Sequence, residues 1–258
     1  ASIGTLFLAG ILPGLLMGLG LMVTALLVGS KSELETLPKA SAKERWTAFR
    51  DAFWGLLMPV IILGGIYGGI FTPTEAAAVS VIYGLFVGIF IYRQIRFREL
   101  YTLLLDSVST TATVMFITAA ASLFAYVLTR ARLDVAISTA LQQVTGGSTM
   151  IFFIIVNIIL LIAGCFLDST SALYIFTPLF VPVANALGID LVHLGVVMIV
   201  NLAIGLFTPP VGVNLYVACG VADVNLKDIS KAVIPLLIAS ILVLLIVTYV
   251  PAVSLAFV

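Results

Sequence analysis

Residues 201–220 read NLAIGLFTPPVGVNLYVACG, and this stretch decides the fold because helix-breaking residues interrupt an apolar segment near its middle. Proline cannot continue a helix and glycine tolerates unusual backbone dihedrals, so the sequence from Thr208 to Gly212 predicts a break. Only ten residues, 213–222, follow before the next charged residue. A helix needs about 20 apolar residues to cross a bilayer, so this second half cannot span alone. We therefore predict one membrane helix over residues 191–222, broken near its middle.

A second interruption lies just upstream. Residues 150–167 are apolar, the polar sequence DSTS occupies residues 168–171, and residues 172–187 are apolar again. Each apolar arm has only 16 to 18 residues, which is short for a complete crossing. This pattern favours a re-entrant hairpin over residues 150–190, with its tip at the polar sequence.

The composition excludes a water-soluble globular domain. Of 258 residues, 62% are hydrophobic and 9% are charged, against roughly half and roughly a quarter in soluble domains. Lys and Arg number 12, and so do Asp and Glu, so the charge balance gives no indication of nucleic acid as a partner. The sequence predicts an all-α polytopic membrane protein embedded in the lipid bilayer.

The other segments follow from the same length criterion. Trp46, Phe49 and Phe53 recur at spacings of three and four, which predicts an interfacial helix whose aromatic stripe docks against the membrane plane or a partner subunit. Pro73 and Thr74 divide the long apolar run that follows, because Pro cannot continue a helix and Thr can cap a new one. The predicted organisation is a crossing over residues 1–29, a linker with the interfacial helix over 30–53, crossings at 54–71, 74–92 and 101–129 with an interfacial arm inside 54–149, the hairpin over 150–190, the broken helix over 191–222 and one final crossing over 223–258.

The positive charges orient these segments, because Lys and Arg in short loops prefer the cytoplasm. If residues 3–29 run from outside to inside, the loops 30–52, 93–98 and 223–231 are cytoplasmic and carry five, three and two basic residues, which leaves two outside. This distribution predicts that the hairpin opens from the outer side and that the C-terminus is periplasmic.

The two interruptions have the chemistry of a site for a cation and a small anion. Non-helical backbone at membrane depth leaves carbonyl groups unpaired unless protein, water or an ion satisfies them. Neutral oxygens with one carboxylate suit a hard cation such as sodium, and half-helix N-termini offer partial positive charge to an anionic substrate. The alternative is that the prolines and glycines serve only as kinks and packing contacts. The predicted sodium and substrate site consists of Asp168, Ser169, Thr170, Ser171, Gly205, Thr208, Pro209, Gly212 and Asn214.

A glycine-rich sequence is a secondary candidate. Residues 64–75 read GGIYGGIFTPTE, and Gly65, Gly68 and Thr72 are its candidate binding residues. Close helix packing explains the same glycines equally well. Glu75 falls in the first turn of a predicted helix, where its charge interacts favourably with the helix dipole.

The motifs do not indicate an enzyme. The sequence contains no H-E-x-x-H, G-x-S-x-G or Walker A pattern, and its single histidine limits triad chemistry. That histidine, His193, lies close to Asp190 at a predicted outer edge, so we expect it to be solvated. No organic cofactor is expected, and sodium is the expected coupling ion.

Two sequence blocks resemble a known transporter family. GGIYGGIFTPTEAAA at residues 64–78 and NLAIGLFTPPVGVNLYVACG at residues 201–220, supported by residues 164–190, resemble the large membrane subunit of tripartite ATP-independent periplasmic (TRAP) transporters of the DctM or SiaM type. Residues 6–23, LFLAGILPGLLMGLGLMV, are similar to the helix that closes the first repeat of this family. The chain would then be the C-terminal part of such a subunit, without its first repeat.

The resemblance implies a fold and a function. The fold is an elevator-type ion transporter with inverted repeats, re-entrant hairpins and broken helices. Sodium would drive uptake of a small organic acid, such as a C4-dicarboxylate or sialic acid, across the bacterial inner membrane. The implied partners are a periplasmic binding protein, a small membrane subunit and the N-terminal repeat of the same subunit. Two alternatives stay open: a non-transporting assembly or scaffold subunit, and a dicarboxylate or citrate symporter that needs no binding protein.

Overall fold

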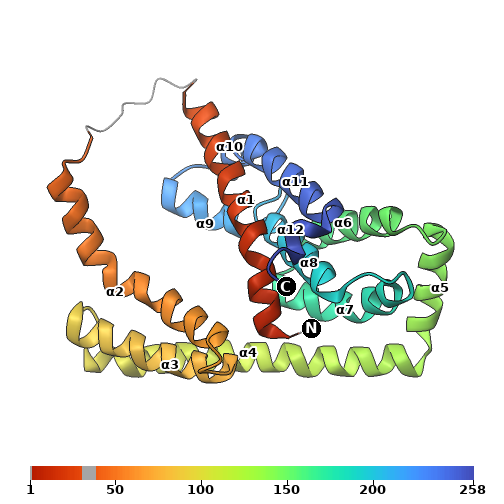
Figure 1. The fold of residues 1–258 in the computed structure, drawn as a ribbon, viewed down its shortest axis with the longest axis horizontal. Helices are drawn as coiled ribbons and strands as arrows, with labels where there is room; N and C mark the ends of the chain where they lie inside the picture. Colours follow the sequence, from red (N-terminus) through yellow and green to blue (C-terminus); the bar gives the residue numbers. More distant parts are fainter. Residues whose placement is uncertain (1, 31–38) are drawn as a thin grey trace. The chain divides into compact units, whose positions relative to one another are not determined.

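The computed structural model describes residues 2–30 and 39–258, whose helices are drawn in Figure 1. Within these residues the regular structure is entirely helical, without a strand. Among them, five helices are long and apolar enough to cross a membrane, and α10 (Leu226–Ala232) with α11 (Ile234–Tyr249), bent by 48°, would make a sixth span. The prediction of an all-α polytopic membrane protein is confirmed.

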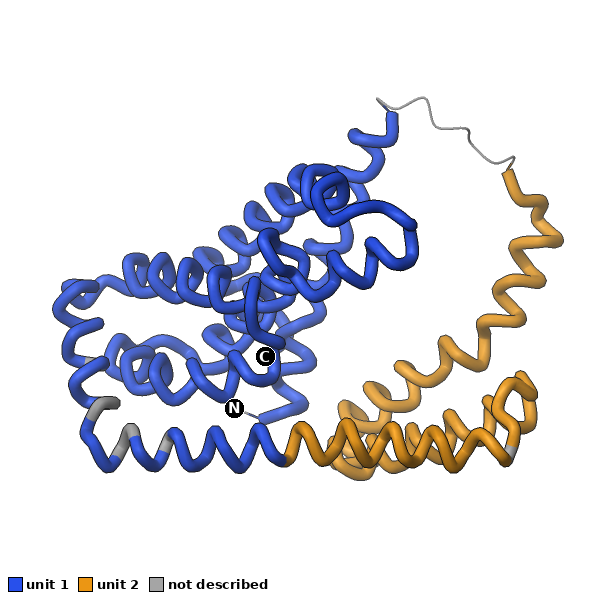
Figure 2. The backbone as a smooth tube through the Cα atoms, turned by 180° about the vertical axis from the view of Figure 1, so that it is seen from behind, with its two compact units in different colours: residues 1–33, 116–258 blue, residues 34–115 orange. Residues whose placement is uncertain are grey.

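The chain divides into two compact units (Figure 2). One contains residues 1–33 and 116–258, and the other contains residues 34–115. Helix α4 (Phe97–Arg130) contributes to both units and covers the predicted crossing at residues 101–129.

In the unit of residues 34–115, α2 (Ala42–Tyr67) is one continuous helix of 26 residues. Ser41 and Glu44 form a capping box at its start, in which the Glu44 carboxylate accepts a hydrogen bond of 2.6 Å from the Ser41 amide. The predicted division into an interfacial helix and a separate crossing at residue 54 is therefore wrong. Gly55 and Pro59 lie close to the predicted boundary, and α2 continues through both of them.

The end of α2 lies at Tyr67, before the predicted residue 71. Gly69 has a φ of 67°, and the amides of Ile70 and Phe71 both donate to the carbonyl of Gly65, at 2.9 and 3.1 Å. These bonds reverse the chain. Thr72 then caps α3 (Pro73–Phe86), which continues into the short π-helix η1 (Val87–Ile91).

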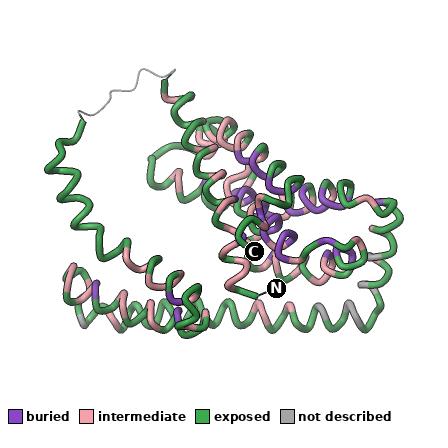
Figure 3. Tube along the Cα trace, viewed as in Figure 1, coloured by how far each residue is buried: buried purple, intermediate pink, exposed green. Residues whose placement is uncertain are grey.

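The other unit carries most of the buried core. Helix α6 packs chiefly on α8, and α1 packs chiefly on α11. Figure 3 shows the buried residues gathered on these central helices. Helices α6 and α8 therefore lie at the centre of this unit. Its elements besides α4, α10 and α11 are α1 (Ile3–Gly29), α5 (Leu133–Thr145), α6 (Thr149–Phe166), α7 (Ser169–Ala186), α8 (Leu191–Gly205), α9 (Val213–Ala222) and α12 (Pro251–Leu255).

The predicted single crossing over residues 223–258 is divided in the structure into α10, α11 and α12. Pro235 is the second residue of α11 and Pro251 is the first residue of α12. Proline lacks an amide donor and fits the first turn of a helix, so each of the two prolines begins a new helix.

Candidate functional site

The break between α8 and α9 is a compact loop over residues 206–212. The amide of Thr208 donates to the carbonyl of Gly205 at 3.0 Å, and the Thr208 hydroxyl donates to the carbonyl of Ile204 at 2.7 Å. The amide of Asn214 donates to the carbonyl of Leu206 at 2.9 Å, which closes the loop. The Asn214 side chain is exposed, whereas Thr208 is half-buried.

The backbone conformation at position 212 requires a glycine. Its φ is 54°, a region that residues with a side chain rarely adopt. A Cβ atom there would lie 2.9 Å from the carbonyl oxygen and 3.1 Å from the nitrogen of Thr208. The Gly212 amide donates to the carbonyl of Cys165 at 3.1 Å, so the loop is bonded to the last turn of α6.

The polar sequence at residues 168–171 starts α7. Asp168 is the N-cap, and its Oδ2 accepts a hydrogen bond of 3.0 Å from the amide of Ser171. Asp168 and Thr170 are exposed, and Ser169 and Ser171 are half-buried. The bond from Asp168 therefore stays within its own helix, and its carboxylate remains accessible.

Two glycines bring the hairpin and the broken helix into backbone contact. A Cβ atom added to Gly205 would lie 2.6 Å from the Cα atom of Gly164, and one added to Gly164 would lie 3.0 Å from the Cα atom of Gly205. The Sγ atom of Cys165 lies 3.1 Å from the carbonyl oxygen of Leu161 and 3.8 Å from that of Pro209. Gly205, Pro209 and Gly212 thus meet the end of α6, three residues before Asp168.

A buried polar ladder, not predicted from the sequence, runs beside this contact. The Asn201 Nδ2 donates to the carbonyl oxygen and to Oδ1 of Asn157, at 3.1 and 2.8 Å, and the Asn157 Nδ2 donates to the Thr248 hydroxyl at 3.2 Å. The Oδ1 of Asn201 has no partner among the described residues, although Asn201 is 0% exposed. Asparagines inside apolar runs were the available sequence signal for this ladder.

His193 is buried, with 3% exposure, so the expectation of a solvated histidine is wrong. Its Nε2 lies 3.1 Å from the Thr248 carbonyl, and its Nδ1 lies 2.9 Å from the Ser254 hydroxyl. A carbonyl can only accept, so Nε2 carries a proton. These two partners lie on α11 and α12, 55 and 61 residues further along the sequence.

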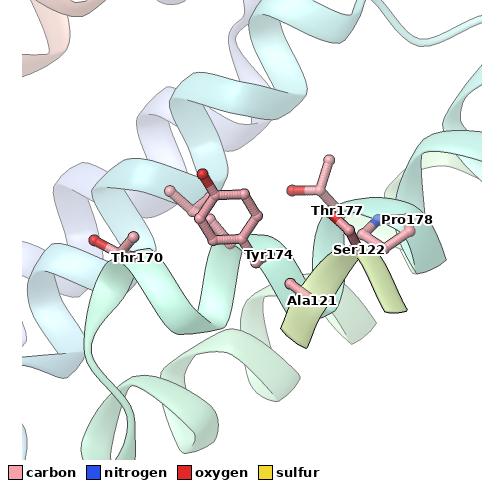
Figure 4. A pocket seen from close by; sticks show the side chains of 7 residues that line it. Ala121, Ser122, Thr170, Tyr174, Thr177 and Pro178 are labelled. Atoms are coloured by element: carbon pink, nitrogen blue, oxygen red, sulfur yellow. The ribbon is translucent and has the colours of Figure 1, made fainter. Parts of the chain in front are cut away.

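A cavity of about 470 Å³ lies between α7 and the second part of α4 (Figure 4). Tyr174 lies between Thr170 and Thr177 in this view, and its hydroxyl accepts a hydrogen bond of 3.1 Å from the Thr118 hydroxyl. Thr170 is the one predicted site residue among the residues that line this cavity. None of the lining side chains is charged. The lining consists of Ala121, Ser122, Thr170, Leu173, Tyr174, Thr177 and Pro178.

The secondary candidates lie in the unit of residues 34–115, where the recorded bonds build a turn. The Gly65 carbonyl accepts the two amides that reverse the chain, and the Gly68 amide donates to the Gly64 carbonyl at 2.8 Å. Thr72 caps α3, and its amide and hydroxyl each donate to a Glu75 carboxylate oxygen at 2.8 Å. These contacts agree with a structural role, and a binding role for the three residues stays a prediction.

The oxygen atoms around the break are of the kind that hard monovalent cations bind. They are backbone carbonyls and the Thr208 hydroxyl, with the Asp168 carboxylate on the adjoining helix end. Among the residues that the structure describes, no group of three or more His, Cys, Asp or Glu side chains forms a transition-metal site.

The chain matches known proteins over nearly its whole length. Residues 1–253 match the family described as "Tripartite ATP-independent periplasmic transporter, DctM component". The chain is 48% identical to the C4-dicarboxylate TRAP transporter large permease protein DctM of Pseudomonas aeruginosa, over 99% of this chain and 60% of that protein. It is 40% identical to the sialic acid TRAP transporter large permease protein SiaM of Vibrio cholerae, over 97% of this chain and 58% of that protein. It is 42% identical to the isethionate TRAP transporter permease protein DctMQ of Oleidesulfovibrio alaskensis, over 100% of this chain and 40% of that protein. The chain thus spans at most 60% of the length of these three relatives.

Proposed function

The chain belongs to the DctM family of tripartite ATP-independent periplasmic transporter components, and from this premise we propose that it forms part of a membrane permease that imports a small organic acid together with sodium. The family consists of transporter permease subunits, which are not enzymes. The relatives named above are permeases for a C4-dicarboxylate, sialic acid and isethionate. These three compounds share an acidic group, so an organic anion is the proposed substrate class.

The observation that carries the proposal is the bond between the loop at residues 206–212 and the last turn of α6, directly before the polar sequence at residues 168–171. The Gly212 amide donates to the Cys165 carbonyl, and Gly164 meets Gly205 through their backbones. The non-helical loop after α8 is thereby held against the C-terminal turn of α6, and broken-helix transporters build ion sites from unwound backbone and the C-terminal ends of half-helices. The Thr208 hydroxyl donates its hydrogen to the carbonyl of Ile204, so the lone pairs of its oxygen stay available to a ligand. Those lone pairs suit a sodium ion.

Two helix N-termini near the bonded loops support the proposal that the substrate is an anion. Helix α7 begins at Ser169 and α9 begins at Val213. Within the described residues, α9 has Gly212 at its N-cap and no side-chain cap. The amides of Asn214 and Leu215 donate to the backbone carbonyls of Leu206 and Gly212, so what the start of α9 offers to a carboxylate or sulfonate is chiefly the partial positive charge of the helix end.

We propose that the complete permease contains more protein than this chain. The N-terminal repeat of the same subunit would supply the other side of the site, as in elevator-type transporters with inverted repeats. A small membrane subunit and a periplasmic binding protein complete the proposed assembly, which the description of the family as tripartite and periplasmic supports. The proposed location is the bacterial inner membrane with the C-terminus in the periplasm, which the excess of basic residues in the segments 30–52, 93–98 and 223–231 supports.

Uptake in proteoliposomes that contain the full-length subunit, the small subunit and the binding protein tests the proposal. We expect uptake of a C4-dicarboxylate or sialic acid only with an inward sodium gradient. Thr208→Val, which keeps the shape and removes the hydroxyl, should abolish sodium-dependent uptake. Thr139→Val is the matched control, because the Thr139 hydroxyl makes the same kind of bond, 2.8 Å to the carbonyl four residues earlier, on α5.

Three results would overturn parts of the proposal. Unchanged sodium dependence in Thr208→Val would remove Thr208 from the ion site. Uptake that persists without the subunit would indicate a scaffold subunit, and uptake without the binding protein would indicate an independent symporter.

A further inference from the structure

An exposed aromatic face covers the first turns of α2. Trp46, Phe49 and Phe53 are 68%, 50% and 40% exposed. Each ring contacts the next one along the helix: the ring centroids are 5.8 Å apart for Trp46 and Phe49 and 6.2 Å apart for Phe49 and Phe53. The three rings therefore form one continuous apolar stripe, and Figure 3 shows this part of α2 as exposed.

Basic residues border this stripe on both sides. A helix advances by about 100° per residue, so residues four apart lie next to each other on its surface. Arg45 lies four residues before Phe49, and Arg50 lies four residues after Trp46, which places one arginine on each side of the rings. Lys43 lies on the same side as Arg50. All three basic residues are exposed.

The acidic residues lie on the opposite face of the same helix. Glu44 and Asp51 are seven residues apart, so they share a face that points away from the rings. The Glu44 carboxylate is also engaged by the Ser41 amide at the N-terminus of the helix. The aromatic face is thus bordered by positive charge, and the negative charge lies behind it.

The length of α2 brings this face to the edge of a bilayer. A helix of 26 residues is about 39 Å long at about 1.5 Å per residue. The hydrocarbon core of a bilayer is about 30 Å thick. Because the second part of α2 is the apolar part, the excess of about 9 Å, or roughly six residues, lies at its start and reaches the lipid headgroups. Phe49, Arg50 and Phe53 follow within the next two turns, at the boundary of the hydrocarbon, from which the long Arg50 side chain can extend to the headgroups.

We propose that this face of α2, formed by Lys43, Arg45, Trp46, Phe49, Arg50 and Phe53, binds the headgroups of anionic phospholipids. The rings occupy the boundary between headgroups and acyl chains, where Trp and Phe are favoured. The guanidinium and ammonium groups bind lipid phosphates beside them. An acidic protein segment has the same charge but no acyl chains for three exposed rings, so the rings favour a lipid.

Quenching of Trp46 fluorescence by brominated lipids tests the proposal on the full-length subunit, in a variant in which every other tryptophan, including Trp54, is phenylalanine. The vesicles contain phosphatidylcholine with one quarter phosphatidylglycerol, and either lipid carries the bromine. At equal mole fraction, brominated phosphatidylglycerol should quench at least about twofold more than brominated phosphatidylcholine, because each basic residue near the surface attracts anionic lipid. High salt should lower this excess, since exposed charges are screened.

Variants separate the charge from the fold. Lys43→Gln, Arg45→Gln and Arg50→Gln together should remove the excess quenching, whereas Lys43→Arg, Arg45→Lys and Arg50→Lys should keep it. The matched control replaces Arg93, Arg96 and Arg98 by Gln, which removes the same charge elsewhere and should leave the excess unchanged. Equal quenching by both lipids in the unaltered protein would overturn the proposal. Absence of quenching by either lipid would also overturn it, because a protein surface would then cover Trp46. Neither outcome depends on transport.

Discussion

The backbone amide of Gly212 donates a hydrogen bond of 3.1 Å to the backbone carbonyl of Cys165. This bond joins the loop between α8 and α9 to the last turn of α6, 47 positions earlier in the sequence. At the residue before Cys165, the backbones of Gly164 and Gly205 approach so closely that a Cβ on either would lie within 3.0 Å of the Cα of the other. The loop is therefore held by main-chain atoms, so its shape depends on the absence of side chains at three glycines.

The first prediction concerns the contact between Gly164 and Gly205. In Gly205→Ala the new Cβ atom would lie 2.6 Å from Cα and 2.7 Å from the carbonyl carbon of Gly164, so the backbones must separate. We expect a loss of about 1–3 kcal/mol in the free energy of unfolding, measured as a lower midpoint of thermal unfolding in detergent. Gly10→Ala is the control, because no heavy atom of the described residues lies within 4 Å of a Cβ there. A midpoint equal to that of the unaltered protein would refute the close contact.

The second prediction separates backbone strain from crowding in the loop. Gly212 and Gly146 have almost the same φ, 54° and 56°, but only Gly212 has backbone atoms of Thr208 within 3.1 Å of a Cβ. Both alanine variants carry the strain of a left-handed residue, about 1–2 kcal/mol. We expect Gly212→Ala to unfold at a lower temperature than Gly146→Ala and to lose sodium-dependent uptake. If the two variants had the same unfolding temperature and both kept sodium-dependent uptake, the backbone around Thr208 would be able to move away from the new Cβ atom without loss of stability.

The ends of the helices at the interruptions are local features and can be predicted from short sequences. Thr208 to Gly212 contains two prolines, which lack amide donors, and a glycine with positive φ. Asp168 is a favourable N-cap residue, and it does cap α7. The chemistry that ends or begins these helices lies within five residues, so no knowledge of the rest of the chain is needed.

The burial of His193 and the contact of Gly164 with Gly205 depend on distant segments. His193 looked like an edge residue because α8 begins at Leu191, but Ser254 and Thr248 enclose it. Nothing in the amino-acid sequence around Gly164 indicates that its backbone packs against Gly205. The length of α2 was missed for another reason: the change from polar to apolar residues near Trp54 marks a change of surroundings rather than the end of a helix.

The third prediction concerns the buried asparagine pair. Asn201→Ala would leave the carbonyl oxygen and Oδ1 of Asn157 without the donor they share. An unsatisfied buried acceptor costs about 1–3 kcal/mol, so the midpoint of thermal unfolding should fall clearly. Asn185→Ala, at an exposed position of α7, should leave the midpoint nearly unchanged. The pair should also be non-additive: with Asn157→Leu already present, Asn201→Leu should cost less than it does alone, and strict additivity would argue against the ladder.

The fourth prediction separates two roles of Asp168, as a helix cap and as a charge. Asparagine caps a helix about as well as aspartate, whereas alanine loses about 0.5–2 kcal/mol at an N-cap. Asp168→Asn should therefore unfold like the unaltered protein, and Asp168→Ala should be less stable. If the carboxylate takes part in binding sodium, Asp168→Asn should raise the sodium concentration for half-maximal uptake by about tenfold, which corresponds to about 1.4 kcal/mol. Asp190→Asn is the matched control, because Asp190 caps α8 by the same kind of bonds, to the amides of Val192 and His193. An unchanged sodium requirement in Asp168→Asn, with reduced stability only in Asp168→Ala, would show that Asp168 acts as a cap alone, and the ion site would then consist of neutral oxygens around Thr208.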